Sequence, residues 1–201
     1  MKNVIGDEME LKVDENAKAL IFDIDGTLVD TMEIHYKAWE KMFALQGFNY
    51  PREVFYELAG IPTYKIVPIL NERYNLKLDP EETMNEKEKY FMELFSAVKE
   101  IKVVSDIARK YHGVLPMSLG TGGRKDIAQM TMETVGLSKY FDIMVAAEDV
   151  IHHKPAPDTF LKCAELMGVE PQFCQVFEDG ELGLQAARTA GMIATDVRPY
   201  L

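Results

Sequence analysis

The sequence contains little cysteine. Only Cys163 and Cys174 occur among the 201 residues, and both lie in apolar surroundings. A disulfide-stapled scaffold or a thiolate-ligated zinc site needs more cysteines at closer spacing. We therefore expect two reduced residues of the hydrophobic core, in a cytoplasmic protein.

Basic side chains are also scarce. There are 22 lysines and arginines against 33 aspartates and glutamates, which gives a formal net charge of -11. Such a field repels nucleic acids and anionic membranes, so we expect neither as a partner. It also repels phosphorylated small molecules, so any phosphate site must be made locally positive by a metal, a lysine and backbone N–H groups.

Long apolar runs, internal repeats and low-complexity segments are absent as well. No stretch approaches the roughly 20 apolar residues of a membrane-spanning helix, and the polar residues 1–16 lack the apolar run of a signal peptide. We expect residues 1–16 to be loose or to form an edge segment. With 47% hydrophobic and 27% charged residues, the chain suits one good-sized domain, or one domain that carries a smaller insert.

An apolar stretch that runs directly into two carboxylates organises the chain. Residues 19–22 are Ala-Leu-Ile-Phe and predict a strand buried on both faces. Asp23 and Asp25 follow, and extended backbone would point both to the same side. Because two neighbouring acids repel each other, we expect a hard cation such as Mg²⁺ between them. Asp-x-Asp-Gly also occurs in calcium loops, but Thr27 and Val29 stand where such a loop needs acids.

Residues 31–98 show only helical patterns. Asp30, with Glu33 three residues later, is expected to cap the first helix. The apolar face of that helix should consist of Ile34, Ala38, Met42 and Leu45. Further helices are expected over residues 51–58 and 63–74 and after Asp79-Pro80. No strand pattern interrupts this block, which predicts an all-helical insert.

From residue 101 onward, helices and strands alternate. Helices are expected over residues 103–111, 124–135, 155–167 and 181–190. Strands are expected over residues 114–119, 141–147, 173–177 and 192–195. Pro116 lacks the N–H of a central strand, so we expect a bulge or an irregular edge there. The alternation predicts an α/β fold, a Rossmann-like doubly wound parallel sheet over residues 1–30 and 99–201, with an inserted all-helical cap domain over 31–98.

Four of the expected strand ends carry polar residues that suit a phosphoryl group. Ligands of parallel sheets bind at the carboxyl ends of the strands. Alone, each segment is also compatible with an ordinary turn, a solvated loop charge or a helix cap, but together they indicate one site. The segments are Asp23-x-Asp25, Thr121-Gly122-Gly123, His152-His153-Lys154-Pro155 and Glu178-Asp179.

In their order along the chain and in their residue types, these segments resemble the four motifs of the haloacid dehalogenase superfamily of phosphohydrolases. The resemblance extends over nearly the whole chain. The resemblance implies that Asp23 is a nucleophile that forms an aspartyl-phosphate, and that Asp25 acts as general acid and then as general base. It further implies that Thr121, the Gly122 N–H and Lys154 hold the phosphoryl oxygens.

The same resemblance implies a Mg²⁺ cofactor. Its ligands would be the Asp23 carboxylate, the Asp25 carbonyl and Asp179, with Glu178 binding directly or through water. Superfamily dehalogenases lack an acid at the position of Asp25, and the related transport ATPases carry threonine there. The acid at this position therefore favours phosphatase chemistry.

The helical block is similar to the C1 cap of the phosphoglycolate phosphatase and β-phosphoglucomutase branch, which closes as a lid and selects the leaving group. His35 and Trp39 match the His-x-x-x-Trp of the mutases, whose histidine contacts the acid/base aspartate. The alternative is a solvated histidine beside a packed tryptophan.

The segment from Gly60 to Thr63 resembles the substrate-selecting loop of this cap. The mutases have an arginine that clamps a second phosphate where this chain has Thr63. Arg124 and Lys65 are the candidate substitutes for that arginine, but the difference disfavours a mutase, which must bind a bisphosphate.

The amino-acid sequence of residues 152–161 and 176–179 resembles that of bacterial fructose-1-phosphate phosphatases that also accept 6-phosphogluconate. We predict a magnesium-dependent phosphatase of a small phosphorylated sugar or sugar acid, cytoplasmic, and a monomer or weak homo-oligomer. β-Phosphoglucomutase is the alternative activity. A non-enzymatic phosphoacceptor like a receiver domain is a further alternative, but receivers are shorter and lack a cap.

Overall fold

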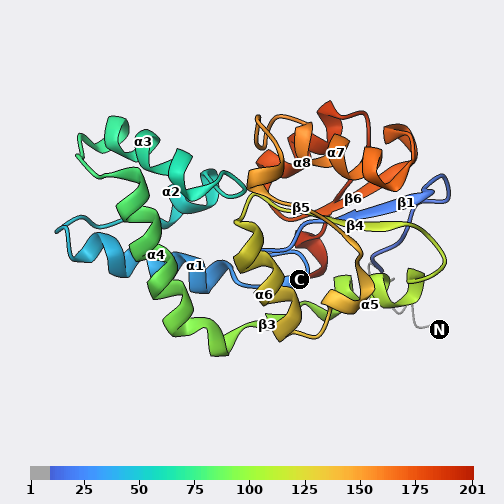
Figure 1. The fold of residues 1–201 in the computed structure, drawn as a ribbon, viewed down its shortest axis with the longest axis horizontal. Coiled ribbons are helices and arrows are strands. Elements are labelled where there is room, and N and C mark those ends of the chain that lie inside the picture. Colours follow the sequence, from blue (N-terminus) through green and yellow to red (C-terminus); the bar gives the residue numbers. More distant parts are fainter. Residues whose placement is uncertain (1–9) are drawn as a thin grey trace, which may run out of the picture.

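A five-stranded parallel sheet forms the centre of the protein, for which the computed structural model describes residues 10–201 (Figure 1). The strand order is β5-β4-β1-β6-β7, and every pairing in it is parallel. The strands are β1 (Ala19–Phe22), β4 (Met117–Gly120), β5 (Ile143–Val145), β6 (Cys174–Glu178) and β7 (Ile193–Asp196). The predicted Rossmann-like sheet is confirmed.

Strand β1 is buried on both faces, which explains its unbroken apolar run. Leu20 and Phe22 belong to the hydrophobic cluster that also includes residues of α5 and α6. Ala19 and Ile21 point the other way, into the cluster that includes residues of α7 and α8. These helices are α5 (Lys102–Tyr111), α6 (Lys125–Thr134), α7 (Asp158–Met167) and α8 (Glu181–Thr189). The two faces of the sheet are thus both covered, as a doubly wound fold requires.

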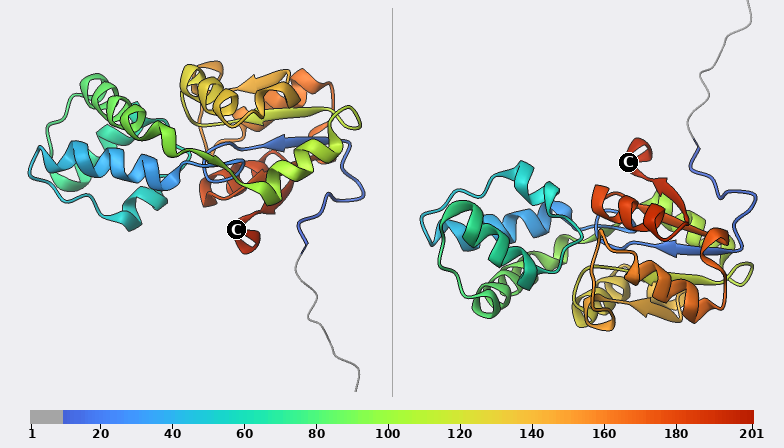
Figure 2. Two further views of the ribbon diagram at one scale, coloured as in Figure 1. Left: turned by 90° about the horizontal axis from the view of Figure 1, so that it is seen from below. Right: turned by 90° about the horizontal axis from the view of Figure 1, so that it is seen from above.

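Four helices stand beside the sheet instead of on its faces (Figures 1 and 2). They are α1 (Met32–Ala44), α2 (Arg52–Glu57), α3 (Thr63–Tyr74) and α4 (Pro80–Leu94). We call residues 31–98 the helical region. Helix α4 packs against both α1 and α3, and the interior is aromatic: Trp39 stacks on Phe43 with ring centroids 5.4 Å apart. The all-helical character predicted for this block is confirmed.

Two short strands join the helical region to the sheet. They are β2 (Val29–Asp30) and β3 (Lys99–Glu100), which pair antiparallel with Val29 opposite Glu100. The sequence analysis missed both, since two residues are too few to show an alternating pattern. Single turns of 3₁₀ helix complete the described elements: η1 (Phe95–Ala97), η2 (Ser138–Tyr140), η3 (Ala147–Asp149), η4 (Pro171–Phe173) and η5 (Arg198–Tyr200).

Several local predictions were wrong. Asp30 lies in β2, and Thr31 is the residue that precedes α1, without a side-chain cap bond. Leu45 is the C-cap residue of α1 and is 68% exposed, so it does not belong to the buried face of the helix. The bulge or irregular edge expected at Pro116 is not found, because β4 begins after this residue and lies between β5 and β1. The Pro116 carbonyl still accepts a hydrogen bond from the N–H of Leu20.

The segment before β1 is anchored over its described part. Leu11 is buried in the core. The side chain of Gln175 on β6 accepts from the Asp14 N–H and donates to the Lys12 carbonyl. Of the two alternatives predicted for residues 1–16, a loose or an edge segment, the loose one is therefore wrong for residues 10–16, and residues 1–9 lie outside the described residues. Both cysteines are free and buried, as predicted. Over residues 10–201, none of the helices combines the length and apolar character needed to cross a membrane.

Candidate active site

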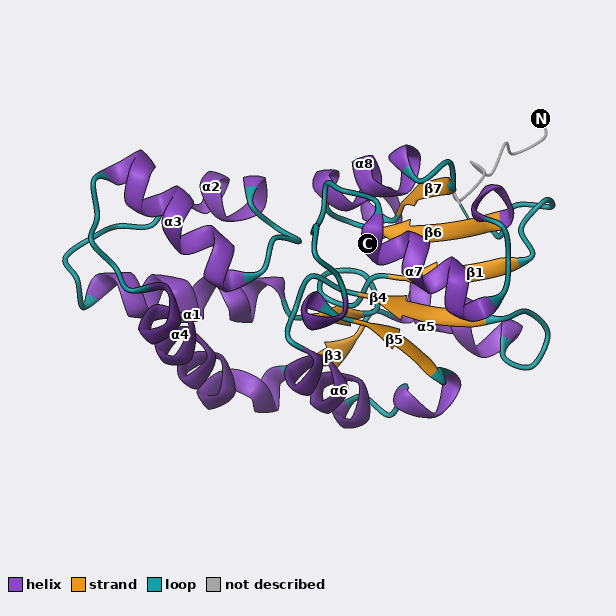
Figure 3. Cartoon of the chain, turned by 45° about the horizontal axis from the view of Figure 1, so that its top comes forward, coloured by secondary structure: helices purple, strands orange, loops and turns teal. Residues whose placement is uncertain are grey.

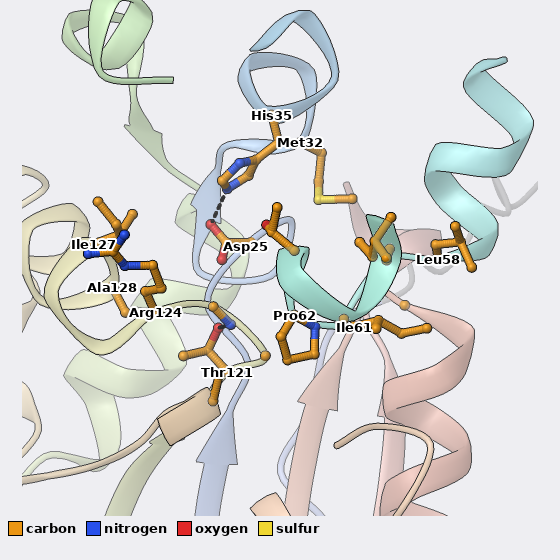
Figure 4. Close-up of a pocket in the computed structure, with 18 of the residues that line it drawn as sticks. Asp25, Met32, His35, Leu58, Ile61, Pro62, Thr121, Arg124, Ile127 and Ala128 are labelled. Carbon is orange, nitrogen blue, oxygen red and sulfur yellow. Dashed lines mark hydrogen bonds and ion pairs between the residues drawn. The ribbon is translucent and has the colours of Figure 1, made fainter. Parts of the chain in front are cut away.

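The carboxyl ends of the strands point toward the helical region (Figure 3). A cavity of about 470 Å³ lies between the two, lined by residues of both (Figure 4). From the sheet side, the predicted site residues that line it are Asp23, Asp25, Thr121, Gly122, Glu178 and Asp179. From the helical region they are His35, Trp39, Gly60 and Thr63.

Lys154 lies directly behind this surface, between two carboxylates. Its Nζ donates to Asp23 Oδ1 at 2.6 Å and to Glu178 Oε2 at 2.7 Å. All three side chains are almost completely buried. Although burial lowers the pKa of Lys154, the charges of Asp23 and Glu178 outweigh it and raise the pKa above the usual range. The lysine is thus held as a cation, which suits a ligand of phosphoryl oxygens.

Three carboxylates meet at the ends of β1 and β6. Oxygens of Asp23, Glu178 and Asp179 all lie within 4.8 Å of one another. Burial and the neighbouring Glu178 carboxylate raise the pKa of Asp23, and the same causes raise the pKa of Asp179 to about 7. Lys154 offsets only one of the three charges, so a divalent cation would balance the other two. Oxygen donors of this kind and number fit a hard cation.

Small residues make room for these carboxylates. A Cβ on Gly26, whose φ is +85°, would lie 2.3 Å from Asp179 Oδ2. A Cβ on Gly183 of α8 would lie 2.0 Å from Glu178 Oε2. Neither contact was predicted from the sequence, since neither Gly26 nor Gly183 carries a local signal for it. Both positions can accept only glycine without displacing an acid of the cluster.

Asp25 faces away from the cluster, toward the helical region. Its Oδ1 accepts a hydrogen bond from Thr31 Oγ1 at 2.6 Å and lies 3.3 Å from His35 Nε2 (Figure 4). Burial raises the pKa of Asp25, but the hydrogen bonds from His35 and Thr31, together with the charge of Lys87, outweigh it and lower the pKa to about 2. The side chain is therefore an ionised carboxylate in this state.

Lys87 of α4 completes a chain of contacts to Asp25. Its Nζ lies 2.8 Å from His35 Nδ1. Because an ammonium group only donates, Nδ1 accepts and the Nε2–H faces Asp25. Phe91 stacks on the His35 ring with centroids 4.2 Å apart. The sequence analysis missed Lys87. The available signal was a lysine four residues before Phe91, within the apolar face of a helix, where a charge needs a partner.

The loop after β4 presents a hydroxyl group and closely packed glycines to the cavity. The hydroxyl oxygen of Thr121 accepts from the Gly123 N–H at 2.9 Å, which leaves its own hydrogen free to donate. A Cβ on Gly122 would lie 2.1 Å from the carbonyl oxygen of Gly60, so only glycine fits here. Gly60 itself has φ +90° and packs near the Lys154 side chain. The turn before α3 therefore contacts two of the predicted phosphate-binding residues.

The predicted substitutes for the mutase arginine are engaged elsewhere. Arg124 forms two hydrogen bonds to Asp126, at 2.6 and 3.1 Å. Lys65 Nζ lies 3.4 Å from the Ile151 carbonyl oxygen. Thr63 lines the cavity but carries no charge. Of these three positions, only Arg124 places a cation at the cavity wall, and that cation is paired with Asp126.

Comparison with known proteins identifies the family of the chain. The family model of haloacid dehalogenase-like hydrolases matches residues 20–197, and the chain belongs to this family. It is thus an enzyme of a hydrolase family, and the family predicted from the sequence is confirmed.

Individual relatives are similar over nearly their full length. The chain is 45% identical over 185 residues to the fructose-1-phosphate phosphatase YqaB of Escherichia coli, covering 92% of this chain and 98% of that protein. It is 29% identical over 179 residues to the phosphorylated carbohydrates phosphatase of Thermotoga maritima, covering 87% and 82%. Among solved structures, β-phosphoglucomutase from Clostridium difficile superposes with a TM-score of 0.79 at 25% identity, covering 90% of this chain and 84% of that one.

Proposed function

We propose that the protein is a magnesium-dependent phosphatase of small sugar phosphates, of the fructose 1-phosphate or 6-phosphogluconate type. The observation that carries the proposal is the buried contact between Lys154 and Asp23 at the carboxyl end of β1. Asp23 and Thr121, in the loop after β4, line the same cavity. The similarity to YqaB and to a phosphorylated carbohydrates phosphatase supports the substrate class.

The reaction proceeds in two displacements at phosphorus. A carboxylate oxygen of Asp23 attacks the phosphoryl group, the bond to the sugar oxygen breaks, and Asp25 protonates that oxygen. Water then attacks the aspartyl-phosphate, Asp25 takes its proton, and phosphate and the free Asp23 carboxylate result. Lys154, Thr121 and the Gly122 N–H hold the phosphoryl oxygens and offset their charge.

Mg²⁺ fits the acidic cluster. Asp23, Asp179 and the Asp25 carbonyl would hold it, with Glu178 binding directly or through water, and it would supply the positive charge that keeps Asp23 ionised beside an anionic substrate. The hydrogen bond from the Gly180 N–H and the contact with Lys154 orient the Glu178 carboxylate.

We further propose that residues 31–98 act as a cap domain on a core of residues 1–30 and 99–201. The cap would exclude water from the cavity and choose the leaving group. A cytoplasmic location and a monomeric or weakly associated state remain predictions from the sequence.

A phosphate-release screen with Mg²⁺ tests the proposal. The substrates are fructose 1-phosphate, 6-phosphogluconate, phosphoglycolate, and β-glucose 1-phosphate with trace glucose 1,6-bisphosphate. We expect many turnovers of free phosphate from a sugar phosphate. Glucose 6-phosphate formed without free phosphate would establish the mutase instead. Release of at most one equivalent per chain would indicate a phosphoacceptor.

Removal of divalent cations with EDTA is expected to abolish phosphate release, and added Mg²⁺ should restore it. Without the cation, burial and the neighbouring carboxylates raise the pKa of Asp23 and disfavour the nucleophilic carboxylate. The measurement is phosphate release before chelation, after it, and after Mg²⁺ is returned. Full activity in the chelated enzyme would contradict the metal assignment.

Replacement of Lys87 by methionine is expected to lower kcat about 10- to 100-fold, because His35 loses the partner that orients it toward Asp25. KM for the sugar phosphate should change less. The exposed Lys89, two residues later on the same helix, provides the control Lys89→Met. Equal kcat in the two variants would mean that the contact between Lys87 and His35 does not position the acid/base group.

A further inference from the structure

Glu88 on α4 lines the cavity and has an unused acceptor atom. Its Oε1 accepts a hydrogen bond from Lys87 Nζ at 3.0 Å. Its Oε2 is buried and has no hydrogen-bond partner among the described residues. The side chain is 13% exposed. A buried carboxylate oxygen without a donor is unfavourable. Since Glu88 lines the cavity, rotation of its carboxylate toward the cavity would let a ligand hydroxyl supply the missing donor.

The position of Glu88 places this acceptor on the side of the leaving group. Asp25 contacts His35, His35 contacts Lys87, and Lys87 contacts Glu88. The phosphoryl-binding residues Lys154 and Thr121 belong to the sheet side. A substrate whose phosphoryl group lies at Asp23 therefore extends its remaining atoms toward α4.

The charges on this wall disfavour a second anion. Among the described residues that line the cavity, the cationic side chains Lys87 and Arg124 are already paired, Lys87 with Glu88 and Arg124 with Asp126. Glu148 also lines the cavity, and its carboxylate accepts the Lys125 N–H. The Lys87 side chain is only 4% exposed against 13% for Glu88, so an anionic leaving group would meet the carboxylate of this ion pair more than its cation. Hydroxyl groups could instead donate to the Glu88 carboxylate.

We propose that Glu88 selects the leaving group: it accepts hydrogen bonds from hydroxyls and rejects a carboxylate or second phosphate at that end of the substrate. The substrate class is then the monophosphates of neutral sugars or polyols, in preference to sugar acids and bisphosphates. This inference rests on the proposed phosphatase function and narrows it.

Glucitol 6-phosphate and 6-phosphogluconate provide a matched pair of substrates. Both are open-chain six-carbon monophosphates, and they differ at C1, where the first has a CH₂OH group and the second a carboxylate. We expect the wild type to have a kcat/KM about tenfold or more higher for glucitol 6-phosphate, from the cost of placing like charges together. Glu88→Gln should bring the ratio close to one, mainly through a lower KM for 6-phosphogluconate.

Glu88→Gln keeps the shape of the side chain and an acceptor for Lys87, so the contact to His35 can persist. Glu86→Gln removes the same charge from α4 at a residue that does not line the cavity, and it should leave the substrate ratio unchanged. Dissociation constants of both compounds for Asp23→Asn, with and without Glu88→Gln, give the same comparison by calorimetry without turnover.

The outcomes separate the two proposals. Absence of phosphate release by the wild type from every sugar phosphate would overturn the proposed function. Three outcomes would overturn only the role of Glu88. The first is turnover by Glu88→Gln with an unchanged ratio of kcat/KM for the two substrates, and the second is an equal loss of kcat/KM on both. The third is a preference of the wild type for 6-phosphogluconate.

Discussion

Replacement of Asp23 by asparagine is expected to abolish phosphate release, with a loss in kcat of about 10⁴-fold or more, as for other nucleophiles of covalent catalysis. The amide keeps the size of the side chain and can still accept from Lys154 Nζ, so the site should keep its shape. An amide oxygen cannot form the aspartyl-phosphate. The measurement is steady-state phosphate release together with mass spectrometry of the denatured enzyme after a brief exposure to substrate.

The same variant should fold as well as the wild type. Burial and neighbouring carboxylates raise the pKa of Asp23, so its charge is unfavourable in the metal-free folded protein at neutral pH. Its removal should leave the midpoint of thermal unfolding unchanged or higher. Asp30→Asn makes the same chemical change at an exposed residue of β2 and should stay active. Activity of Asp23→Asn within tenfold of the wild type would mean that another group attacks phosphorus.

Replacement of Asp25 by asparagine is expected to slow both displacements by about 10²- to 10⁴-fold. The lowered pKa means that Asp25 is ionised in the free site and is ready to accept a proton from water. Its role as an acid requires a proton first, and the negative charge of an incoming phosphoryl group favours that protonation. Both roles are lost when the carboxylate becomes an amide.

A substrate whose leaving group needs no proton separates the two roles. With p-nitrophenyl phosphate, the first step of Asp25→Asn should recover while hydrolysis of the aspartyl-phosphate stays slow, so one equivalent of nitrophenol appears in a burst. Thr31→Val removes a hydrogen bond to Asp25 and a longer one to the Val29 carbonyl, and it should cost far less. If the variant is impaired to the same extent on p-nitrophenyl phosphate and on a sugar phosphate, Asp25 is not the acid of the first step.

Local sequence patterns predict the sheet and the residues at its strand ends. The apolar run before Asp23 can only be buried on both faces, and the edge of a parallel sheet gathers the residues that follow its strands. For the same reason Thr121 and Asp179 were found without knowledge of the structure, although they lie far from Asp23 in sequence. Their functional roles follow from the resemblance to the family and are tested by the variants above.

Contacts across the cavity could not be predicted in this way. Lys87 pairs with His35 at a separation of 52 residues, and nothing local marks the partner. Gly183 is required because the Glu178 carboxylate fills the space of its missing side chain. Leu45 shows the opposite error: it has the correct spacing for the apolar face, but the helix ends before it. Such features depend on how elements meet, which a periodic pattern does not encode.

Strands β2 and β3 place the entrance and the exit of the helical region next to each other, with Val29 opposite Glu100. Because the two ends of the helical region are neighbours, its length and internal arrangement hardly constrain the positions of the strands in the sheet. Its helices can therefore be lengthened, shortened or exchanged during evolution while the strand ends keep their positions. Reaction chemistry and choice of substrate can then vary independently, because each is encoded in a different part of the same gene.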